Sequence, residues 1–307
     1  MDTAMLSTLL AGAGLACLAW GFHSRSGSRS LVAAAGWVLM GAHFTSTIGS
    51  YVAIWDTVLI IMTAAALPIG VVLARWELRG YAGSEDDALV WFRGMVLWAG
   101  LPYMLVDRVP WLNILAIWFV AWQTTVFMRW SGAGDIQLGE TNVSLGDGTE
   151  VAWADWDGNK WFMTDGFGEH PFQTELIMAD GGAIGINFVL ACTALQSMIV
   201  FIGAISVLDV DRKRRIRALL FTIPIIHILN LFRNAGLIWM HLSYEGWEYL
   251  GLSMFEFGHS YASRFVSLFA MFVMAIAMFE LLPELHRHIL RLLEAAGLKK
   301  KRSKPSS

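Results

Sequence analysis

The sequence predicts an all-α polytopic membrane protein with about eight transmembrane helices and a small β-rich extracytoplasmic insertion. Composition is the first reason, because 56% of the 307 residues are hydrophobic and only 15% are charged, whereas soluble domains carry about 25% charged residues. Length is the second, because about 18–20 apolar residues in helical form cross the hydrocarbon layer. Five uncharged runs reach that length: Thr3–Ser24, Ser30–Trp55, Thr57–Ala74, Val109–Met128 and Gly182–Leu208.

Three further apolar runs, each interrupted by one arginine, bring the predicted number of spans to eight. They cover about residues 88–106, 218–241 and 260–282. The first span of the chain lacks a basic segment before it, and further spans follow it at once. These features are typical of a transmembrane helix rather than of a cleaved signal peptide.

The spans flank one polar block, which divides the chain into four segments. We expect about five N-terminal transmembrane helices in 1–130, an acidic extracytoplasmic loop in 131–181, three core transmembrane helices in 182–282 and a basic tail in 283–307. In the polar block, the turn signals "GDG" (146–148) and "DGN" (157–159) separate short runs such as "EVAWA" and "KWFMT". This pattern predicts a small β-hairpin or meander.

Two basic clusters determine the predicted orientation. The segment 209–217 and the tail beyond Pro283 are both rich in arginine and lysine. The positive-inside rule places both in the cytoplasm. The C-terminus is therefore predicted to be cytoplasmic, and the polar block 131–181 to lie outside.

The N-terminal half fits this orientation less well. Eight crossings place Arg25, Arg29, Arg75 and Arg79 outside, against the positive-inside rule. Either one helix is interfacial or re-entrant, or the basic residues of the C-terminal half dominate. Both interpretations stay open at the level of sequence.

The chain contains two cysteines, Cys17 and Cys192. A pair this far apart, without a CxxC motif, indicates neither a disulfide framework nor a metal site. We expect no cofactor, no metal and no nucleic-acid partner. Cys17 lies among glycine, alanine and leucine and is interpreted as a packing residue, as a lone cysteine in an apolar run usually is.

Arginines inside the spans are the strongest functional signal from the residues alone. An arginine at the centre of a membrane helix costs at least about 2.5–3.5 kcal/mol, and such residues usually face the bundle interior or a wet cavity. Arg93, near the start of its span, is interpreted as a snorkelling residue. Arg233 in "NLFRNAGLIW" and Arg264 in "GHSYASRFVSLF" are candidate site residues.

Helix rise places these arginines and Cys192 at one level. At 1.5 Å per residue, Cys192 lies about 24 Å above Leu208, and Arg233 about 24 Å above Arg217. Arg264 lies about 27 Å above Leu282 by the same arithmetic. We therefore predict a site that combines a thiol and two guanidiniums in the outer half of the bilayer. His259 would lie about 7 Å higher.

This combination of groups suits nucleophilic catalysis. A nearby cation stabilises a thiolate and lowers the pKa of the thiol. Because a guanidinium stays protonated, one arginine would stabilise the thiolate or an oxyanion, and the other would bind substrate. His259 is the first candidate for an acid or base and His227 the second.

Three sequence blocks resemble the signature motifs of the exosortase/archaeosortase family, with the archaeosortases the nearest in pattern. They are "LACTALQSM" around Cys192, "HILNLFRNAGLIW" around Arg233 and "FGHSYASRF" around His259 and Arg264. The resemblance covers about residues 182–282. The first 130 residues share only a string of membrane helices.

The resemblance implies a membrane cysteine transpeptidase with Cys192 as nucleophile and Arg233 and Arg264 as its partners. Exosortases have a histidine in the third block, and here His259 and Arg264 are both present. Family substrates are secreted surface proteins, S-layer proteins among them, with a C-terminal tripartite tail: a short motif of the Pro-Gly-Phe type, a hydrophobic helix and a basic cluster. The tail is cut, and the new carboxyl end is transferred to a membrane phospholipid.

Three alternatives remain at this stage. A related enzyme with another recognition motif, or one that only hydrolyses, would use the same residues. A polytopic transporter could bind an anionic substrate through Arg233 and Arg264, but it would leave Cys192 without a role. A scaffold subunit would pair its buried arginines with carboxylates, and Glu256 is the one carboxylate near the outer ends of the last three spans.

Overall fold

The computed structural model describes residues 3–53, 55–80, 84–164, 166–244, 246–249 and 251–295, apart from some side chains, that of His259 among them. The chain forms two compact units. Unit 1 comprises residues 1–101, 202–215 and 281–307, and unit 2 comprises residues 102–201 and 216–280.

The prediction of a polytopic helical membrane protein is confirmed. Seven helical segments in the described part of the chain are long and apolar enough to cross a membrane. They are Met5–His23, Arg29–Ala53, Thr57–Arg79, Asp86–Arg108, Pro110–Ser131, Arg212–Ser243 and Ser263–Leu281. An eighth apolar helix, Leu195–Ser206, is shorter.

Unit 1 is built around three tightly packed helices, α1 (Thr3–His23), α2 (Arg29–Ser46) and α4 (Thr57–Arg79), with the short α3 (Ile48–Ala53) between the last two. Glycines allow α2 and α4 to approach closely. A Cβ on Gly70 would lie 2.5 Å from the Trp37 carbonyl oxygen, and one on Gly41 would lie 2.9 Å from that of Ala66. Small residues at such crossings are typical of membrane helix pairs.

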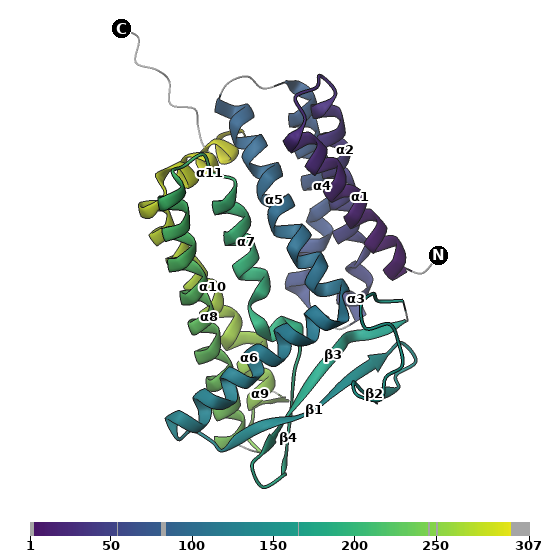
Figure 1. The fold of residues 1–307 in the computed structure, drawn as a ribbon, viewed down its shortest axis with the longest axis vertical. Helices are drawn as coiled ribbons and strands as arrows, with labels where there is room; N and C mark the ends of the chain where they lie inside the picture. The colour runs from purple at the N-terminus through teal and green to yellow at the C-terminus, as the bar shows by residue number, and fades with distance from the viewer. Residues whose placement is uncertain are drawn as a thin grey trace. The chain divides into compact units, whose positions relative to one another are not determined.

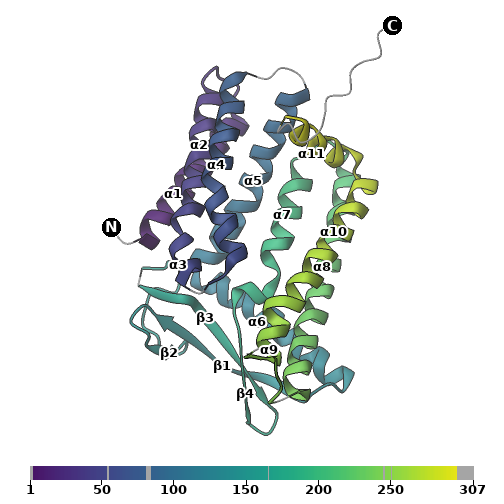
Figure 2. The ribbon, with the colours of Figure 1, turned by 180° about the vertical axis from the view of Figure 1, so that it is seen from behind.

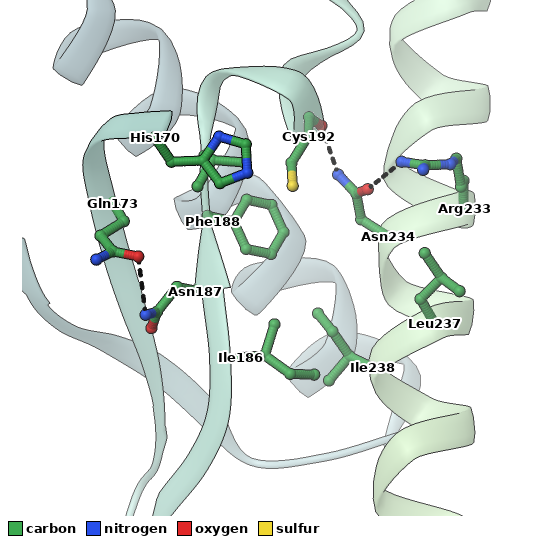
Figure 3. A pocket seen from close by; sticks show the side chains of 11 residues that line it. His170, Gln173, Ile186, Asn187, Phe188, Cys192, Arg233, Asn234, Leu237 and Ile238 are labelled. Carbon is green, nitrogen blue, oxygen red and sulfur yellow. Dashed lines mark hydrogen bonds between the residues drawn. The ribbon is translucent and has the colours of Figure 1, made fainter. Parts of the chain in front are cut away.

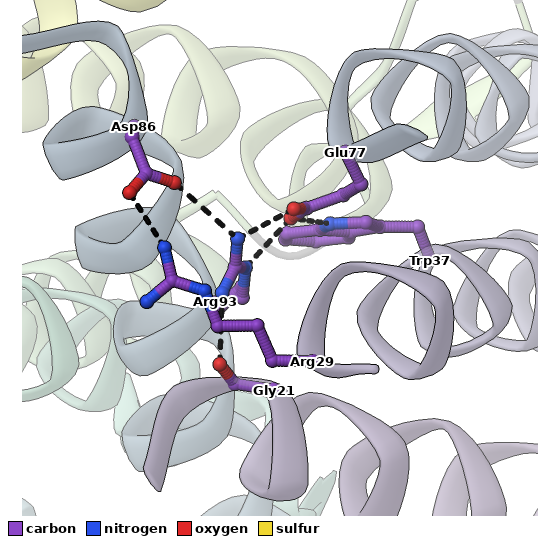
Figure 4. A network of polar contacts seen from close by, with 6 residues as sticks. All are labelled: Gly21, Arg29, Trp37, Glu77, Asp86 and Arg93. Carbon is purple, nitrogen blue, oxygen red and sulfur yellow. Dashed lines mark hydrogen bonds and ion pairs between the residues drawn. The ribbon is translucent and has the colours of Figure 1, made fainter. Parts of the chain in front are cut away.

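Arg93 of α5 (Ser84–Arg108) is fully buried in unit 1 and does not snorkel, so that interpretation is wrong. Its guanidinium forms a bidentate ion pair with Glu77 and also donates to the Gly21 carbonyl at 2.8 Å (Figure 4). The Trp37 indole donates to the same Glu77 carboxylate at 3.0 Å. The buried charge is therefore compensated by a carboxylate on a neighbouring helix.

Several chain turns meet at one end of unit 1. Arg29, at the start of α2, pairs with Asp86, at the start of α5, at 2.7 Å. A cavity of about 550 Å³ at this end is lined by residues of α1, α2, α5, the 207–209 segment and α11 (Pro283–Ala295). The α1–α2 turn, the start of α5 and the basic segment that begins at Asp209 therefore share one end of the unit.

Unit 2 contains a four-stranded antiparallel sheet in the order β2-β1-β3-β4. Its strands are β1 (Ile136–Leu145), β2 (Glu150–Ala152), β3 (Phe167–Met178) and β4 (Ala183–Phe188). The predicted turn at 146–148 is present, with Gly148 at φ 83° and the Leu145 amide donating to the Thr149 carbonyl. The expected strand "KWFMT" is wrong, because residues 160–164 form bends and irregular structure.

Helix α6 (Pro110–Ser131) packs along this sheet (Figure 1). One face of the helix contributes Ile114, Ile117 and Met128 to a core that it shares with Ile136 of β1 and Phe172 of β3. These side chains are almost completely buried. The sheet therefore covers one face of the helix, while Leu115, Phe119 and Trp122 on the other side are exposed.

The prediction of one continuous helix from Gly182 to Leu208 is wrong. The segment contains β4, a 3₁₀ turn η1 (Leu190–Thr193) and the short helix α7 (Leu195–Ser206). Burial alternates along β4, as in a half-buried strand, and Ala194 interrupts the chain at φ 54°. Helix rise therefore does not determine the level of Cys192.

The remaining elements of unit 2 follow α7. Helix α8 (Arg212–Ser243) and helix α10 (Ser263–Leu281) lie side by side, as Figure 2 shows, and the Thr222 hydroxyl contacts the Met278 sulfur at 2.8 Å. The connection contains β5 (Glu248–Tyr249), β6 (Leu252–Ser253), α9 (Met254–Phe257) and the π-helical turn η2 (Gly258–Ala262).

Candidate active site

Cys192 lies in a strained turn between a strand and a helix. Its amide donates to the Val189 carbonyl at 2.9 Å, and the Thr193 hydroxyl donates to the Leu190 carbonyl at 2.7 Å. The next residue, Ala194, has a left-handed conformation, which costs an L-residue about 1–2 kcal/mol. Such strain often occurs at functional sites. A strand, a tight turn and a helix present the nucleophile of many hydrolases in the same way.

Two asparagines of α8 fix the position of this turn. The side-chain amides of Asn230 and Asn234 both donate to the Cys192 carbonyl oxygen, at 2.8 and 3.0 Å. The two asparagines are four residues apart and therefore share one helix face. Both side chains are buried. Their common acceptor is the backbone of the candidate nucleophile.

The described hydrogen-bond partners of Arg233 are neutral groups. Its Nη1 donates to Asn234 Oδ1 and its Nη2 to Ser263 Oγ, each at 3.2 Å. Its Nε is buried without a hydrogen-bond partner among the described residues, and no ion pair of Arg233 occurs there either. The positive charge therefore remains available to an anion that enters the site.

Cys192 and Arg233 line the same cavity, which has a volume of about 200 Å³ (Figure 3). One part of the wall is apolar and comes from Ile186, Phe188, Val189, Leu237 and Ile238. The other part is polar and comes from His170, Gln173, Asn187, Cys192, Arg233 and Asn234. The cavity therefore combines a thiol, a guanidinium and amide groups with an apolar wall.

The turn that holds Cys192 lies outside the seven long apolar helices. Burial raises the pKa of the Cys192 thiol, while a backbone hydrogen bond at Val189 and the Arg233 guanidinium oppose that rise. Because burial is the largest of these effects, the resting thiol is mainly protonated at neutral pH. Reaction as a thiolate therefore requires a group that removes the proton.

The other residues named from the sequence lie elsewhere or outside the description. Arg264 is exposed at the start of α10 and does not line this cavity. The side chain of His259, in η2, lies outside the described residues. His227 shares a hydrogen bond with Gln123, stacks on Phe119 and does not line the cavity.

Three polar residues of the cavity were not identified from the sequence. His170 and Gln173 come from β3 and Asn187 comes from β4. Asn187 donates to the Gln173 side chain at 3.1 Å, and Gln173 donates to Glu150 at 2.6 Å. No sequence motif marks them, because the pairing of two strands brings them to Cys192.

Comparison with known proteins finds one limited similarity. A stretch of 62 residues is 40% identical to archaeosortase A of Haloferax volcanii, and it covers 20% of this chain and 20% of that protein. No protein-family model matches the chain, and no solved structure matches it. The similarity supports a distant relation to the archaeosortases.

Proposed function

We propose that this protein is a membrane-embedded cysteine transpeptidase of the archaeosortase kind. It would cleave the C-terminal tripartite sorting signal of secreted surface proteins, such as S-layer proteins, and transfer the new C-terminus to a membrane phospholipid. The observation that carries the proposal is the cavity shared by Cys192 and Arg233, in which Asn234 bonds both to the Cys192 carbonyl and to the Arg233 guanidinium.

In this proposal the Cys192 thiolate attacks the scissile carbonyl and forms a thioester. Arg233 stabilises first the thiolate and then the oxyanion of the tetrahedral intermediate, because its charge is not neutralised by a carboxylate among the described residues. Arg264 binds the substrate or its oxyanion from the start of α10, next to Ser263, which accepts a hydrogen bond from Arg233. His259 remains a candidate acid or base.

A count of crossings supports an orientation for the enzyme. The start of α5 and the basic segment after α7 share one end of unit 1, yet three helices (α5, α6 and α7) connect them. If all three crossed the membrane, these two ends would lie on opposite sides. We infer that α6, one face of which is covered by the sheet, lies at the membrane surface.

With α6 at the surface, the basic residues of the N-terminal half lie on the same side as 209–217, in agreement with the positive-inside rule. The sheet and the cavity would then lie toward the outer side, and the C-terminal tail in the cytoplasm. An Arg25→Cys variant, made with Cys17→Ser and Cys192→Ser, should resist an impermeant maleimide in intact cells and react after lysis. Labelling in intact cells would overturn this orientation.

The enzymatic proposal is tested with Cys192→Ala and Cys192→Ser. Cells would express each variant together with a tagged surface protein that ends in a tripartite tail, and processing would be followed by immunoblotting and by mass spectrometry of the C-terminus. We expect precursor to accumulate in both variants. Cys17→Ser is the matched control and should process the substrate at the rate of the unchanged protein.

Maturation of the precursor at an undiminished rate in both Cys192 variants would refute the enzymatic proposal. An anion transporter that uses Arg233 and Arg264 would then explain the site better.

A further inference from the structure

The proposed reaction needs a proton donor, and His227, the one sequence-named histidine whose side chain is described, does not line the cavity. Breaking an amide bond requires a proton on the leaving nitrogen, which a general acid usually supplies. A guanidinium cannot supply it, because arginine stays protonated in proteins. Arg233 and Arg264 can therefore stabilise charge but cannot transfer the proton.

His170 is the only other titratable residue that lines the cavity in the described part of the chain, besides Cys192 and Arg233. Its side chain is exposed, so it can exchange protons with water. It makes no hydrogen bond with the described residues, so no structural partner occupies its ring nitrogens. Figure 3 shows the imidazole and the Cys192 sulfur at the same cavity.

The strand register explains how His170 reaches this place. In the pairing of β3 with β4, Thr174 lies opposite Phe188 and Leu176 lies opposite Ile186. His170 lies four residues before Thr174 on β3, and Cys192 lies four residues after Phe188, in the turn that follows β4. The ladder ends at Phe188, but β3 also contacts η1. The end of β3 that carries His170 and the turn that carries Cys192 therefore line one cavity.

The other described histidines near the cavity are already engaged. His227 shares a hydrogen bond with Gln123, and His241 shares one with the Ile184 carbonyl at 3.0 Å. Neither lines the cavity. The ionisable groups that face His170 across the cavity are the Cys192 thiol from η1 and the Arg233 guanidinium from α8.

We propose that His170 is the general base and general acid of the transpeptidase; this inference rests on the proposed function. The neutral imidazole takes the proton of the Cys192 thiol as the sulfur attacks the scissile carbonyl. The imidazolium then gives that proton to the leaving nitrogen as the carbon–nitrogen bond breaks, which leaves a thioester and a free amine. In the second half of the reaction, His170 takes the proton of the acceptor hydroxyl while the hydroxyl oxygen attacks the thioester and displaces the thiolate. His170 then returns that proton to the sulfur.

The test compares two leaving groups at the same bond. The wild-type protein would first cleave a synthetic peptide with a Pro-Gly-Phe-type tail, and mass spectrometry would identify the scissile bond. A second peptide would carry a thioester at that bond, because a thiolate leaves without needing a proton. The wild-type protein and the variants His170→Gln, His259→Gln and His286→Gln would be assayed on both peptides from pH 5 to 9. The peptide and the acceptor would be present at saturating concentrations. His286, at an exposed position of α11, is the control.

We expect His170→Gln to lower amide cleavage by about 100-fold or more, in the range of general acid catalysis. Thioester cleavage at pH 9, where more of the thiol ionises without a base, should fall by less than about 10-fold. In His170→Gln, the residual amide cleavage should rise with pH up to pH 9, because the thiol then has to ionise without a base. His286→Gln should change neither substrate. The midpoint of thermal unfolding should stay that of the wild type, since His170 is exposed.

An equal loss on both peptides at pH 9 would assign His170 a structural role and overturn the inference. So would unchanged amide cleavage in His170→Gln, or a leaving-group-selective loss in His259→Gln alone. The proposed function fails separately, if Cys192→Ala still cleaves the amide peptide.

Discussion

Two arginines lie within apolar helices of this protein, and their surroundings differ. Arg93 in unit 1 is fully buried and pairs through two nitrogens with the Glu77 carboxylate. Arg233 in unit 2 lines a cavity, and its described partners are the neutral side chains of Asn234 and Ser263. A compensated charge holds helices together, whereas an uncompensated charge beside a thiol can stabilise an anion. Depth in the membrane alone does not distinguish these roles.

The largest effect is expected from breaking the compensated pair. Glu77→Ala removes the bidentate partner of the buried Arg93 guanidinium and leaves it the partly exposed Asp86 carboxylate, 4.0 Å away. Breaking a buried pair in this way typically costs about 3–5 kcal/mol. The midpoint of thermal unfolding in detergent should fall markedly. Replacing both residues by leucine should restore most of the stability, because apolar residues can substitute for a buried pair with little loss.

The matched control for this experiment is Arg29→Ala, in the same polar network. The Arg29–Asp86 pair is about one-third exposed on both sides, and such pairs contribute about 0–1 kcal/mol. If Glu77→Ala were no more destabilising than Arg29→Ala, the structural role of the Arg93 pair would have to be abandoned.

The second prediction concerns the uncompensated charge. Arg233→Lys should lower the rate of substrate processing by about 10²–10³-fold, the usual loss when an oxyanion-stabilising group is removed. A lysine ammonium is a point charge and cannot reproduce the planar fork that reaches both Asn234 and Ser263. The midpoint of thermal unfolding should change little, because Arg233 forms no ion pair with the part of the chain that the structure describes.

Arg129→Lys, at an exposed position near the end of α6, controls for loss of any guanidinium in unit 2. It should process the substrate normally. Normal processing by Arg233→Lys would show that the reaction does not need the Arg233 guanidinium, and the functional contrast with Arg93 would then fail.

The sequence was sufficient for the membrane class. Cys192 and Arg233 do line one cavity, but their association was predicted from helix rise along a continuous span that residues 182–208 do not form. Long uncharged runs have few alternatives to membrane helices, and polar residues in such runs tend to face one another. The segment 182–208 was misassigned, because a short apolar run can be a buried strand or a helix. The burial of β4 follows the alternation of apolar residues in "AIGINF", but that pattern covers only six residues of a long uncharged run.

The partners of the charged residues were harder to predict. Glu77 meets Arg93 because α4 and α5 pack in one register, and composition does not specify helix register. His170 and Cys192 line one cavity because β3 pairs with β4, and a histidine within an acidic loop carries no signal of that pairing. Long-range contacts of this kind depend on the folded arrangement.

The smallest effect is expected at the two asparagines that connect the uncompensated arginine to the nucleophile. Asn230→Ala and Asn234→Ala each remove one of two donors to the Cys192 carbonyl, and a neutral hydrogen bond contributes about 0.5–1.5 kcal/mol. We expect kcat to fall by about 3-fold to 10-fold with KM nearly unchanged, and to fall further in Asn234→Ala, since Asn234 also accepts from Arg233.

The double variant leaves the carbonyl without either donor and should lose more than the product of the single losses. A loss confined to KM, or a double variant no worse than Asn234→Ala, would mean that these amides do not position Cys192. The arginine and the thiol would then line one cavity without being held in a fixed position relative to each other.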